Sequence, residues 1–274
     1  MKIAITGATG HIGRQLVREL RTKPYELSLW SLSENPNTLS ADLSTESGVD
    51  RLMSQGPYDI IVHLAAQSKP HLAVNEPDLN KSAIELILQQ ISTSTHVLFA
   101  SSSHVYGSMS ELPVSTSHPL RPRTEYGRQK LRAEMHCRAY INTSILRFFN
   151  CIGFPPKEGT FLYDWTSQIR NGMSPIIVKN ADVDIDLITT EDAAKAIVEV
   201  IQAEIKPRII NVCSGKCINL RETLDKSKAN YISTGNKKLK SLGEPDWLRS
   251  TQWKTNQDIQ ALIVDYLNEQ LMIK

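Results

Sequence analysis

Short apolar runs rich in β-branched residues alternate along the first half of the chain with segments whose apolar residues recur at helical spacing. In residues 12–20, Ile12, Leu16 and Leu20 fall on one helical face, and Arg14 and Arg18 fall on the opposite face. Strands that alternate with helices predict parallel strands joined by helical crossovers. The strands expected are 2–6, 26–32, 58–64, 96–101 and 143–148. We therefore predict an α/β fold with a doubly wound parallel sheet, which binds ligands at the carboxyl ends of its strands.

A glycine-rich turn connects the first predicted strand to the first predicted helix. Its glycines, Gly7, Gly10 and Gly13, suit a tight turn, a close approach of pyrophosphate to backbone, and close packing of helix on sheet. The free amides and dipole at the start of the helix also favour phosphate. A glycine turn without a ligand is the alternative, but the strand–turn–helix context favours dinucleotide binding. The candidate cofactor-binding residues here are Gly7, Thr9, Gly10, His11, Ile12, Gly13 and Arg14.

The residues at the end of the second predicted strand indicate whether the cofactor is NAD or NADP. An acidic residue there would bind the adenosine ribose of NAD, but the strand ends in apolar and hydroxyl residues, and Glu34 comes late. Arg14 is placed to face the 2′-phosphate of NADP, unless it is only a solvated helix residue. We therefore predict NADP, with NAD possible. Asp42 and Leu43 are placed to contact the adenine, unless Asp42 is an ordinary helix cap.

The alternation of strands and helices loosens after about residue 150, where the paired prolines at 155–156 mark a break. We expect residues 1–150 to form a dinucleotide-binding, Rossmann-like domain. Residues 151–274 are expected to form a small C-terminal substrate-binding lobe, partly interleaved with the sheet. The helices expected in this lobe are 161–171, 191–203 and an amphipathic closing helix at 255–271.

Composition narrows the class of partner. The chain has 274 residues and a net charge of +2, with charges of both signs scattered along it, which favours a small molecule over nucleic acid. It has no apolar run long enough to span a membrane and no N-terminal leader pattern, so we expect a cytoplasmic protein without a membrane span. Cys137, Cys151, Cys213 and Cys217 lack the spacing of a zinc site, so we predict no metal.

Further motifs follow the glycine turn in a fixed order. They are 63–66 (His-Leu-Ala-Ala), 101–107 (Ser-Ser-Ser-His-Val-Tyr-Gly), 126–130 (Tyr-Gly-Arg-Gln-Lys) and 146–150 (Leu-Arg-Phe-Phe-Asn). This ordered set resembles the extended short-chain dehydrogenases/reductases, the NAD-dependent epimerase/dehydratase family, and covers about residues 1–220. The resemblance implies a cofactor site that includes Leu64, Ala65 and Ala66.

The four-residue spacing of Tyr126 and Lys130 places both side chains on one face of the predicted helix 124–140. A nearby ammonium favours the phenolate, so we expect Lys130 to bring the pKa of Tyr126 toward neutrality. Lys130 would also hold the nicotinamide ribose. The resemblance gives Ser102 the role of polarising the substrate carbonyl. The alternative, a solvated helix face, is disfavoured by the other motifs, and we predict Ser102, Tyr126 and Lys130 to be catalytic.

The resemblance also implies a set of substrate-binding residues: Ser102, Ser103, His104 and Asn150. Sugar-nucleotide dehydratases carry an Asp-Glu pair where Ser103 and His104 stand, so dehydration is disfavoured. His104 occupies a position that serves as an acid or base in some relatives, or it is a structural histidine. Asn80 is similar to the helix asparagine that holds a proton-relay water in the superfamily, or it is simply an exposed residue.

Two reactions fit these residues best. The favoured one is the reduction of a 4-keto (6-deoxy) sugar nucleotide by NADPH, and the second is the NAD-dependent 4-epimerisation of a sugar nucleotide. An NADP-binding redox regulator without catalysis and a reductase of small hydrophobic carbonyls are further alternatives. Family members usually bind the substrate diphosphate with an arginine at the position of Ile185, so Lys157 and Lys216 are candidate replacements. The resemblance also implies a possible homodimer.

Overall fold

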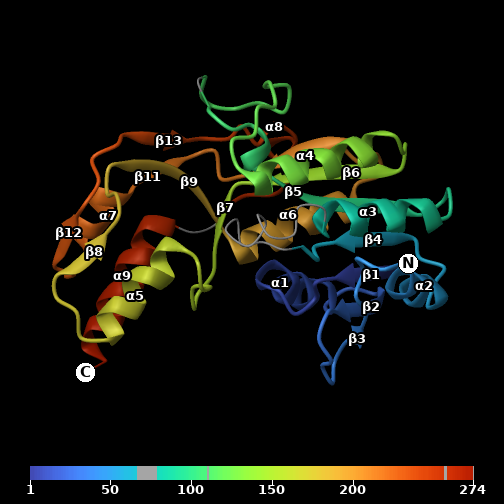
Figure 1. Cartoon of the computed structure of the whole chain (residues 1–274), viewed down its shortest axis with the longest axis horizontal. Helices are drawn as coiled ribbons and strands as arrows, with labels where there is room; N and C mark the ends of the chain where they lie inside the picture. The colour runs from blue at the N-terminus through green and yellow to red at the C-terminus, as the bar shows by residue number, and fades with distance from the viewer. Residues whose placement is uncertain (67–78, 110, 256–257, 274) are drawn as a thin grey trace.

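The computed structural model describes residues 1–66, 79–109, 111–255 and 258–273, with 79–82 as backbone only. Its main sheet has seven parallel strands in the order β10-β6-β5-β4-β1-β2-β3 (Figure 1). These are β1 (Lys2–Thr6), β2 (Glu26–Ser31), β3 (Leu39–Ser40), β4 (Ile60–His63), β5 (His96–Ser102), β6 (Thr143–Phe148) and β10 (Ile209–Val212). The strand order reverses between β1 and β4, which is where a doubly wound sheet binds its ligand.

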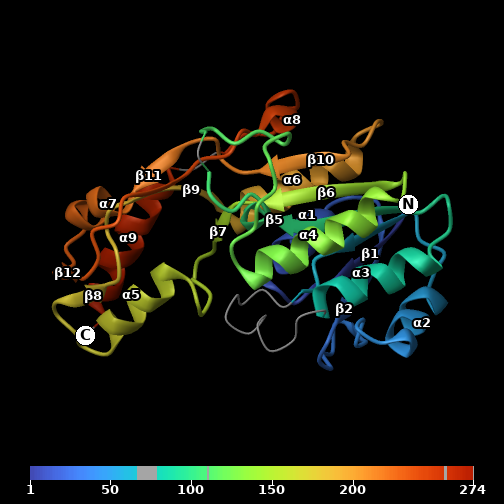
Figure 2. The ribbon, with the colours of Figure 1, turned by 45° about the horizontal axis from the view of Figure 1, so that its top comes forward.

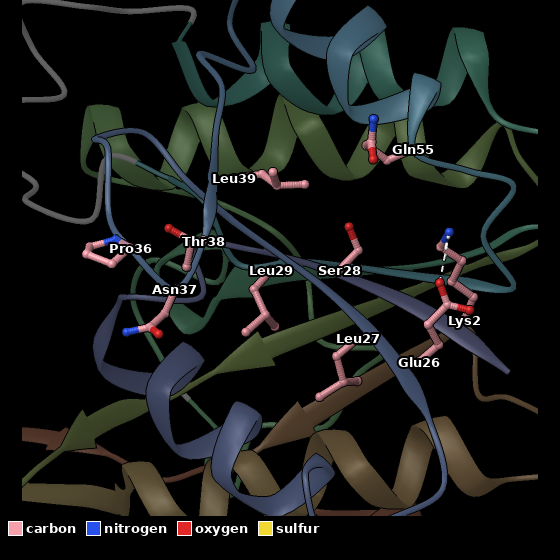
Figure 3. A pocket seen from close by; sticks show the side chains of 10 residues that line it. All are labelled: Lys2, Glu26, Leu27, Ser28, Leu29, Pro36, Asn37, Thr38, Leu39 and Gln55. Atoms are coloured by element: carbon pink, nitrogen blue, oxygen red, sulfur yellow. Dashed lines mark ion pairs between the residues drawn. The ribbon is translucent and has the colours of Figure 1, made fainter.

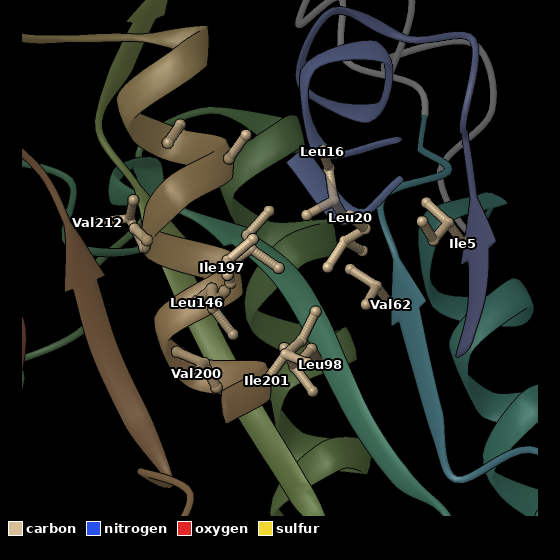
Figure 4. Close-up of a cluster of buried hydrophobic side chains, with 14 of the residues drawn as sticks. Ile5, Leu16, Leu20, Val62, Leu98, Leu146, Ile197, Val200, Ile201 and Val212 are labelled. Atoms are coloured by element: carbon tan, nitrogen blue, oxygen red, sulfur yellow. The ribbon is translucent and has the colours of Figure 1, made fainter. Parts of the chain in front are cut away.

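Helices cover both faces of this sheet (Figures 1 and 2). One face carries α1 (His11–Leu20) and α6 (Thr190–Gln202), and the other carries α2 (Glu46–Ser54), α3 (Leu79–Gln90) and α4 (Glu125–Arg138). In Figure 4, Leu16 and Leu20 of α1 and Ile197 and Ile201 of α6 meet side chains from the central strands, such as Val62. The apolar stripe read from residues 12–20 is therefore the face that α1 buries.

A smaller unit lies beyond the carboxyl ends of the main strands (Figure 1). Its central strand is β9 (Val183–Thr189), which pairs with β11 (Cys217–Asn219), β13 (Leu239–Ser241) and β7 (Asn150–Ile152). A separate pair consists of β8 (Ile176–Val178) and β12 (Tyr231–Ser233). The helices α5 (Phe161–Arg170), α7 (Leu220–Lys226) and α9 (Ile259–Met272) pack on this unit around a core that includes Trp165, Leu187 and Ile263. The short helix α8 (Asp246–Arg249) lies against β10.

The parallel seven-stranded sheet confirms the predicted α/β fold, and β1 and β6 have the predicted bounds. Helix ends differ where a side chain caps the first turn, because the cap lies outside the helix. Thr124 caps α4, and Asp258 caps α9, which therefore begins later than residue 255. Residues 76–78 of the helix expected around Asn80, at 76–91, and residues 256–257 of the closing helix lie outside the described residues. The domain boundary at residue 150 stays a prediction; β10 and α6 return to the main sheet.

Candidate active site

The glycine turn packs too closely for side chains. Gly7 has a φ of +70°, and a Cβ there would lie 2.8 Å from the Ala65 amide nitrogen. A Cβ on Gly13 would lie 2.2 Å from the carbonyl oxygen of Gly7. Thr9 and Gly10 are exposed, and Gly10 begins α1 without a side-chain cap. The start of α1 is therefore left open for a phosphate group, which fits the pyrophosphate of a dinucleotide.

His11 joins this turn to the second half of the chain. A Cβ on Gly153 would lie 3.3 Å from Cε1 and Nδ1 of His11. Burial, Lys157 and Arg14 lower the pKa of His11, whereas Glu191 raises it. Lys157, expected at the substrate diphosphate, is therefore close enough to the glycine turn to act on His11.

Hydroxyl groups stand at the end of β2, where an NAD-binding acid is usual. Ser31 Oγ donates to the Ser33 carbonyl oxygen at 2.8 Å and lies 2.5 Å from Thr38 Oγ1. Arg14 is exposed. The Asp42 carboxylate accepts hydrogen bonds from the amide and hydroxyl of Ser44 at 3.0 and 2.6 Å.

Asp42 is not the cap of α2, because Thr45 accepts the bond from the Gly48 amide. Asp42 is exposed, whereas Leu43 is buried. Leu64 and Ala65 are half-buried, and Ala66 is exposed just before the segment that is not described. The adenine and nicotinamide contacts expected of these residues stay predictions, as does the role of Asn80, whose side chain lies outside the described residues.

The predicted catalytic residues meet where β5 ends. Lys130 Nζ donates to the Ala100 carbonyl oxygen at 2.7 Å, and it lies 6.0 Å from the centroid of the Tyr126 ring. Ser102 forms a side-chain hydrogen bond with Tyr126. Ser102 and Lys130 are buried, and Tyr126 is half-buried. The structure therefore brings Ser102, Tyr126 and Lys130 together, although their catalytic roles stay predictions.

The protonation state of Tyr126 differs from the one expected from the sequence. Burial raises the pKa of Tyr126 to about 12, against a lowering by its hydrogen bond with Ser102. The prediction that Lys130 draws this pKa toward neutrality is wrong here, because burial of the phenol dominates and Lys130 is not among the groups that lower the pKa. Burial lowers the pKa of Lys130 itself to about 8. At neutral pH the phenol keeps its proton and is suited to donate it.

A buried polar network fixes helix α4 behind these residues. Glu134 accepts from Ser101 Oγ at 2.6 Å and forms two bonds with Arg147, Nε to Oε1 at 2.9 Å and Nη2 to Oε2 at 2.7 Å. Arg147 Nη1 also donates to the Tyr106 hydroxyl at 3.0 Å, which donates to Asn211 Oδ1 at 2.6 Å. Both charged side chains are fully buried. The network therefore ties α4 to β5, β6 and β10.

His104 stands edge-on to Tyr126, with ring centroids 5.4 Å apart and an interplanar angle of 83°. Its Nδ1 lies 3.3 Å from Thr124 Oγ1, which also accepts from the Gly127 amide at 3.1 Å and so caps α4. Burial lowers the pKa of His104, so its imidazole is neutral at neutral pH. His104 is therefore held between Tyr126 and the start of α4.

A cavity of about 310 Å³ opens beside His104. It is lined by Ser103, His104, Gly107, Met109, Arg123, Thr124, Asn150, Val183, Asp184, Ile185, Leu239, Lys240 and Ser241. Three of the predicted substrate-binding residues, Ser103, His104 and Asn150, line it, and Asn150 Nδ2 donates to the Asp186 carbonyl oxygen at 3.1 Å. The cavity therefore adjoins Tyr126 through His104, and its role as the substrate site stays a prediction.

The charged residues of this cavity were missed by the sequence analysis. They are Arg123, Asp184 and Lys240, whereas the expected Lys157 and Lys216 are not among its described lining residues. Arg123 precedes α4, and the other two lie on neighbouring strands. No motif marks them, and only the register of β9 with β13 would have found the pair.

Asp186 holds the far wall of the cavity together. Its buried carboxylate accepts from the amides of Ser214, Gly215 and Gly243 at 2.8, 3.0 and 3.1 Å, and from Ser214 Oγ at 2.6 Å. Burial raises the pKa of Asp186, and these bonds lower it. The carboxylate of Asp186 therefore anchors the turn after β10 and the chain after β13 to β9.

A second cavity, of about 380 Å³, lies beside β2 and β3 at the edge of the main sheet (Figure 3). Its lining includes Ser28, Asn37 and Gln55, and the Lys2–Glu26 ion pair of 3.1 Å borders it. None of the predicted site residues lines it. The predicted substrate-binding residues Ser103, His104 and Asn150 line the smaller cavity instead.

A family described as "NAD dependent epimerase/dehydratase family" matches residues 3–213. The chain belongs to this family. It is therefore an NAD(P)-dependent enzyme, which confirms the predicted family and a nicotinamide dinucleotide cofactor. The choice between NADP and NAD stays a prediction.

Two relatives match most of the chain. A putative UDP-glucose 4-epimerase of Methanocaldococcus jannaschii is 26% identical over 247 residues, which cover 81% of this chain and 80% of that protein. GDP-6-deoxy-D-talose 4-dehydrogenase of Aggregatibacter actinomycetemcomitans is 25% identical over 234 residues, covering 78% and 75%. The chain spans only about half the length of several plant UDP-glucose 4-epimerases that it also matches.

A solved structure described as RMD from Pseudomonas aeruginosa complexed with NADPH has a TM-score of 0.84 to this chain. It is 23% identical, with 99% of each chain covered, and shows the same fold.

All four cysteines are free, and no group of three or more His, Cys, Asp or Glu in the described ranges could hold a metal ion. No helix among residues 1–66, 79–109, 111–255 and 258–273 is long and apolar enough to cross a membrane.

Proposed function

We propose that the enzyme reduces the carbonyl of a 4-keto-6-deoxy sugar nucleotide with NADPH. The observation that carries this is the state of Tyr126, a protonated phenol hydrogen-bonded to Ser102 and packed against His104, which lines the 310 Å³ cavity. Bound nicotinamide would supply the hydride to the carbonyl carbon. Tyr126 would give its proton to the oxygen that becomes the hydroxyl, and Ser102 would donate a hydrogen bond to the same oxygen.

Lys130 would replace the proton of Tyr126 and hold the nicotinamide ribose. It is anchored for this by its bond to Ala100, and burial lowers its pKa to about 8, within reach of a proton transfer near neutrality. The cradle of Gly7, Gly10 and Gly13, which a Cβ at Gly7 or Gly13 would fill, suits the pyrophosphate of the cofactor.

The comparisons support this reaction class over dehydration. One relative is named a 4-dehydrogenase of a 6-deoxy sugar nucleotide, and a similar structure is described with NADPH bound. Ser103 and His104 stand where dehydratases carry two acids. The alternative is 4-epimerisation with NAD, favoured by the names of most of the relatives, among them the Methanocaldococcus protein and the plant UDP-glucose 4-epimerases. It would need Tyr126 to remove a proton from a sugar hydroxyl, which a pKa of about 12 makes harder.

The test is to supply NADPH with GDP-, UDP- and dTDP-linked 4-keto-6-deoxy sugars and to follow the loss of NADPH absorbance. Turnover is expected with at least one of them. No consumption, together with NAD that copurifies with the protein, would overturn the reductase and favour the epimerase.

Tyr126→Phe separates an enzyme from a regulator that only binds the cofactor. It removes the proton donor and is expected to lower kcat by about a thousandfold. NADPH binding, followed by fluorescence, should be unchanged because the phenol ring remains. A variant that keeps full turnover would show that another group donates the proton.

Arg14→Ala tests the choice of cofactor. If Arg14 faces the 2′-phosphate, the substitution should raise the KM for NADPH several-fold and leave the KM for NADH unchanged. Arg18, one turn further along α1 and also exposed, offers a matched control. Equal effects of Arg14→Ala on both cofactors would remove the argument for NADP.

We also infer a cytoplasmic location and a homodimer through α3 and α4, by resemblance to the family. Met135 of α4 is 64% exposed, as a residue of such an interface would be in a single chain. Sedimentation of the protein tests the dimer, and a monomeric Met135→Glu variant of a dimeric wild type would support it.

A further inference from the structure

A row of three polar side chains crosses the far wall of the cavity. Asp184 of β9 is paired in register with Asn219 of β11 and with Lys240 of β13. Side chains of residues paired on adjacent strands lie on one face of the sheet. Asp184 and Lys240 both line the 310 Å³ cavity. An acid and a base therefore stand side by side where the substrate of the proposed reaction would lie.

The carboxylate of Asp184 is held in place from one side. Asn219 Nδ2 donates to Asp184 Oδ1 at 2.7 Å. The amide of Asn219 cannot turn freely, because its Oδ1 accepts from the Glu222 amide at 3.0 Å and so caps α7. The orientation of Asp184 is thus set by the backbone of α7 rather than by the neighbouring lysine.

Asp184 and Lys240 form no ion pair in the described part of the chain, although they are neighbours in register. Arg123, on the opposite wall, lines the same cavity. An unpaired carboxylate between two cations would repel a phosphate group unless it accepted hydrogen bonds from the same ligand. The arrangement therefore suits a ligand that carries an anion and hydroxyl donors a few ångströms apart.

We propose that Asp184 binds a vicinal diol of the substrate while Lys240 and Arg123 bind its diphosphate. Two adjacent hydroxyls can both donate to one carboxylate, and diphosphate needs two cations. This rests on the proposed function, because it makes a sugar nucleotide the occupant of the cavity. It also explains how the site works with Ile185 in place of the expected arginine. The diol belongs either to the ribose or to the sugar.

The experiment is calorimetric titration of the protein saturated with NADP⁺, so that the probes meet only the substrate cavity. The probes are UDP, 2′-deoxy-UDP, UDP-glucose and inorganic pyrophosphate. If the ribose is the source of the diol, Asp184→Ala weakens UDP about tenfold and weakens 2′-deoxy-UDP, which keeps only the 3′ hydroxyl, by less, as expected for loss of charged hydrogen bonds. If the sugar is the source, only UDP-glucose is weakened.

The sign of the effect makes the test decisive. If Asp184 merely repelled the diphosphate, Asp184→Ala would tighten UDP and UDP-glucose alike, and that result overturns the proposal. Pyrophosphate, which has no hydroxyls, should bind Asp184→Ala at least as well as wild type. Lys240→Ala should weaken all four probes, most at low salt. Lys238→Ala removes the same charge two residues away, does not line the cavity, and should change none of them.

Asp184→Asn guards against a folding defect, because it keeps an oxygen for Asn219 and removes only the charge. It should lie between wild type and Asp184→Ala in affinity, with an unchanged Tm. The binding role of Asp184 and the proposed reaction can also fail independently of each other. A protein that binds UDP-glucose through Asp184 but consumes no NADPH would overturn the reductase alone. A wild type that binds none of the nucleotide probes would overturn the assignment of Asp184.

Discussion

The two walls of the substrate cavity are built in different ways. Behind the wall formed by the turn after β5 and the start of α4, Tyr126 and Lys130 are fixed by bonds to Ser102 and to the backbone of β5. On the wall formed by β9 and β13, charged side chains are placed by strand register and project from an open sheet. The groups behind the first wall are buried and satisfied internally, whereas Arg123 at its surface and the charges of the second wall face the cavity.

This difference separates the reaction from the choice of substrate. Proton transfer requires that the donor stay within hydrogen-bond reach, so its supports are buried and mutually dependent. Substrate choice requires only that suitable charges line the cavity, so the second wall can change without loss of the fold. The family resemblance is accordingly strong on the first wall and departs at Ile185 on the second.

The largest expected effect comes from breaking the buried network of the first wall. Arg147→Met leaves Glu134 charged and buried without its main partner, so the free energy of unfolding should fall by about 3–5 kcal/mol. Arg138 also lies 3.5 Å from Glu134, but its side chain is 46% exposed. Arg138→Ala is the matched control and should cost at most about 1 kcal/mol. Urea unfolding followed by circular dichroism measures both.

A double variant shows whether the charge or the packing matters. Glu134→Leu with Arg147→Met removes both charges, and should recover part of the stability lost by Arg147→Met alone. It leaves Ser101 without its acceptor and takes one of two partners from the Tyr106 hydroxyl, so full recovery is not expected. If Arg147→Met and Arg138→Ala lower the free energy of unfolding equally, the stability of the first wall does not depend on the buried Glu134–Arg147 pair.

The contrast between the walls also explains what the sequence could predict. Ser102, Tyr126 and Lys130 could be identified because a strand end and one helical turn bring them together, and both are local patterns. Asp184 and Lys240 lie on strands whose pairing is a long-range property of the fold, so neither carried a signal. The prediction of the Tyr126 pKa was wrong for a related reason, because the burial of a side chain depends on segments that are distant in sequence.

The pH dependence of the reaction should follow Lys130. Its pKa of about 8 means that the ammonium is lost above this pH, so kcat/KM for reduction should fall about tenfold per unit there. The Tyr126 phenol, with a pKa of about 12, stays protonated throughout. Stability should change in the opposite direction, because the unfolded chain binds more protons on its lysine above pH 8, so the free energy of unfolding rises.

This opposite trend distinguishes titration from denaturation at high pH. Activity is measured as kcat/KM from pH 6 to 10, and unfolding is measured at the same pH values. A rate that stays flat across this range would mean that the charge of Lys130 plays no part in the slow step. A rate and a stability that fall together would point to unfolding.

The smallest expected effect tests the point where the first wall meets the cavity, at Thr124. Thr124 and Thr45 cap α4 and α2 in the same way, each accepting from an amide three residues on at 3.1 Å. Replacing either with Ala should cost about 1 kcal/mol of stability. Only Thr124 also contacts His104 and lines the cavity, so only Thr124→Ala should raise the KM for the sugar nucleotide, by a few-fold. Thr124→Ser keeps the hydroxyl and should restore both stability and KM. If Thr45→Ala and Thr124→Ala raise KM equally, the effect comes from general loosening of the fold, and His104 is not positioned by the start of α4.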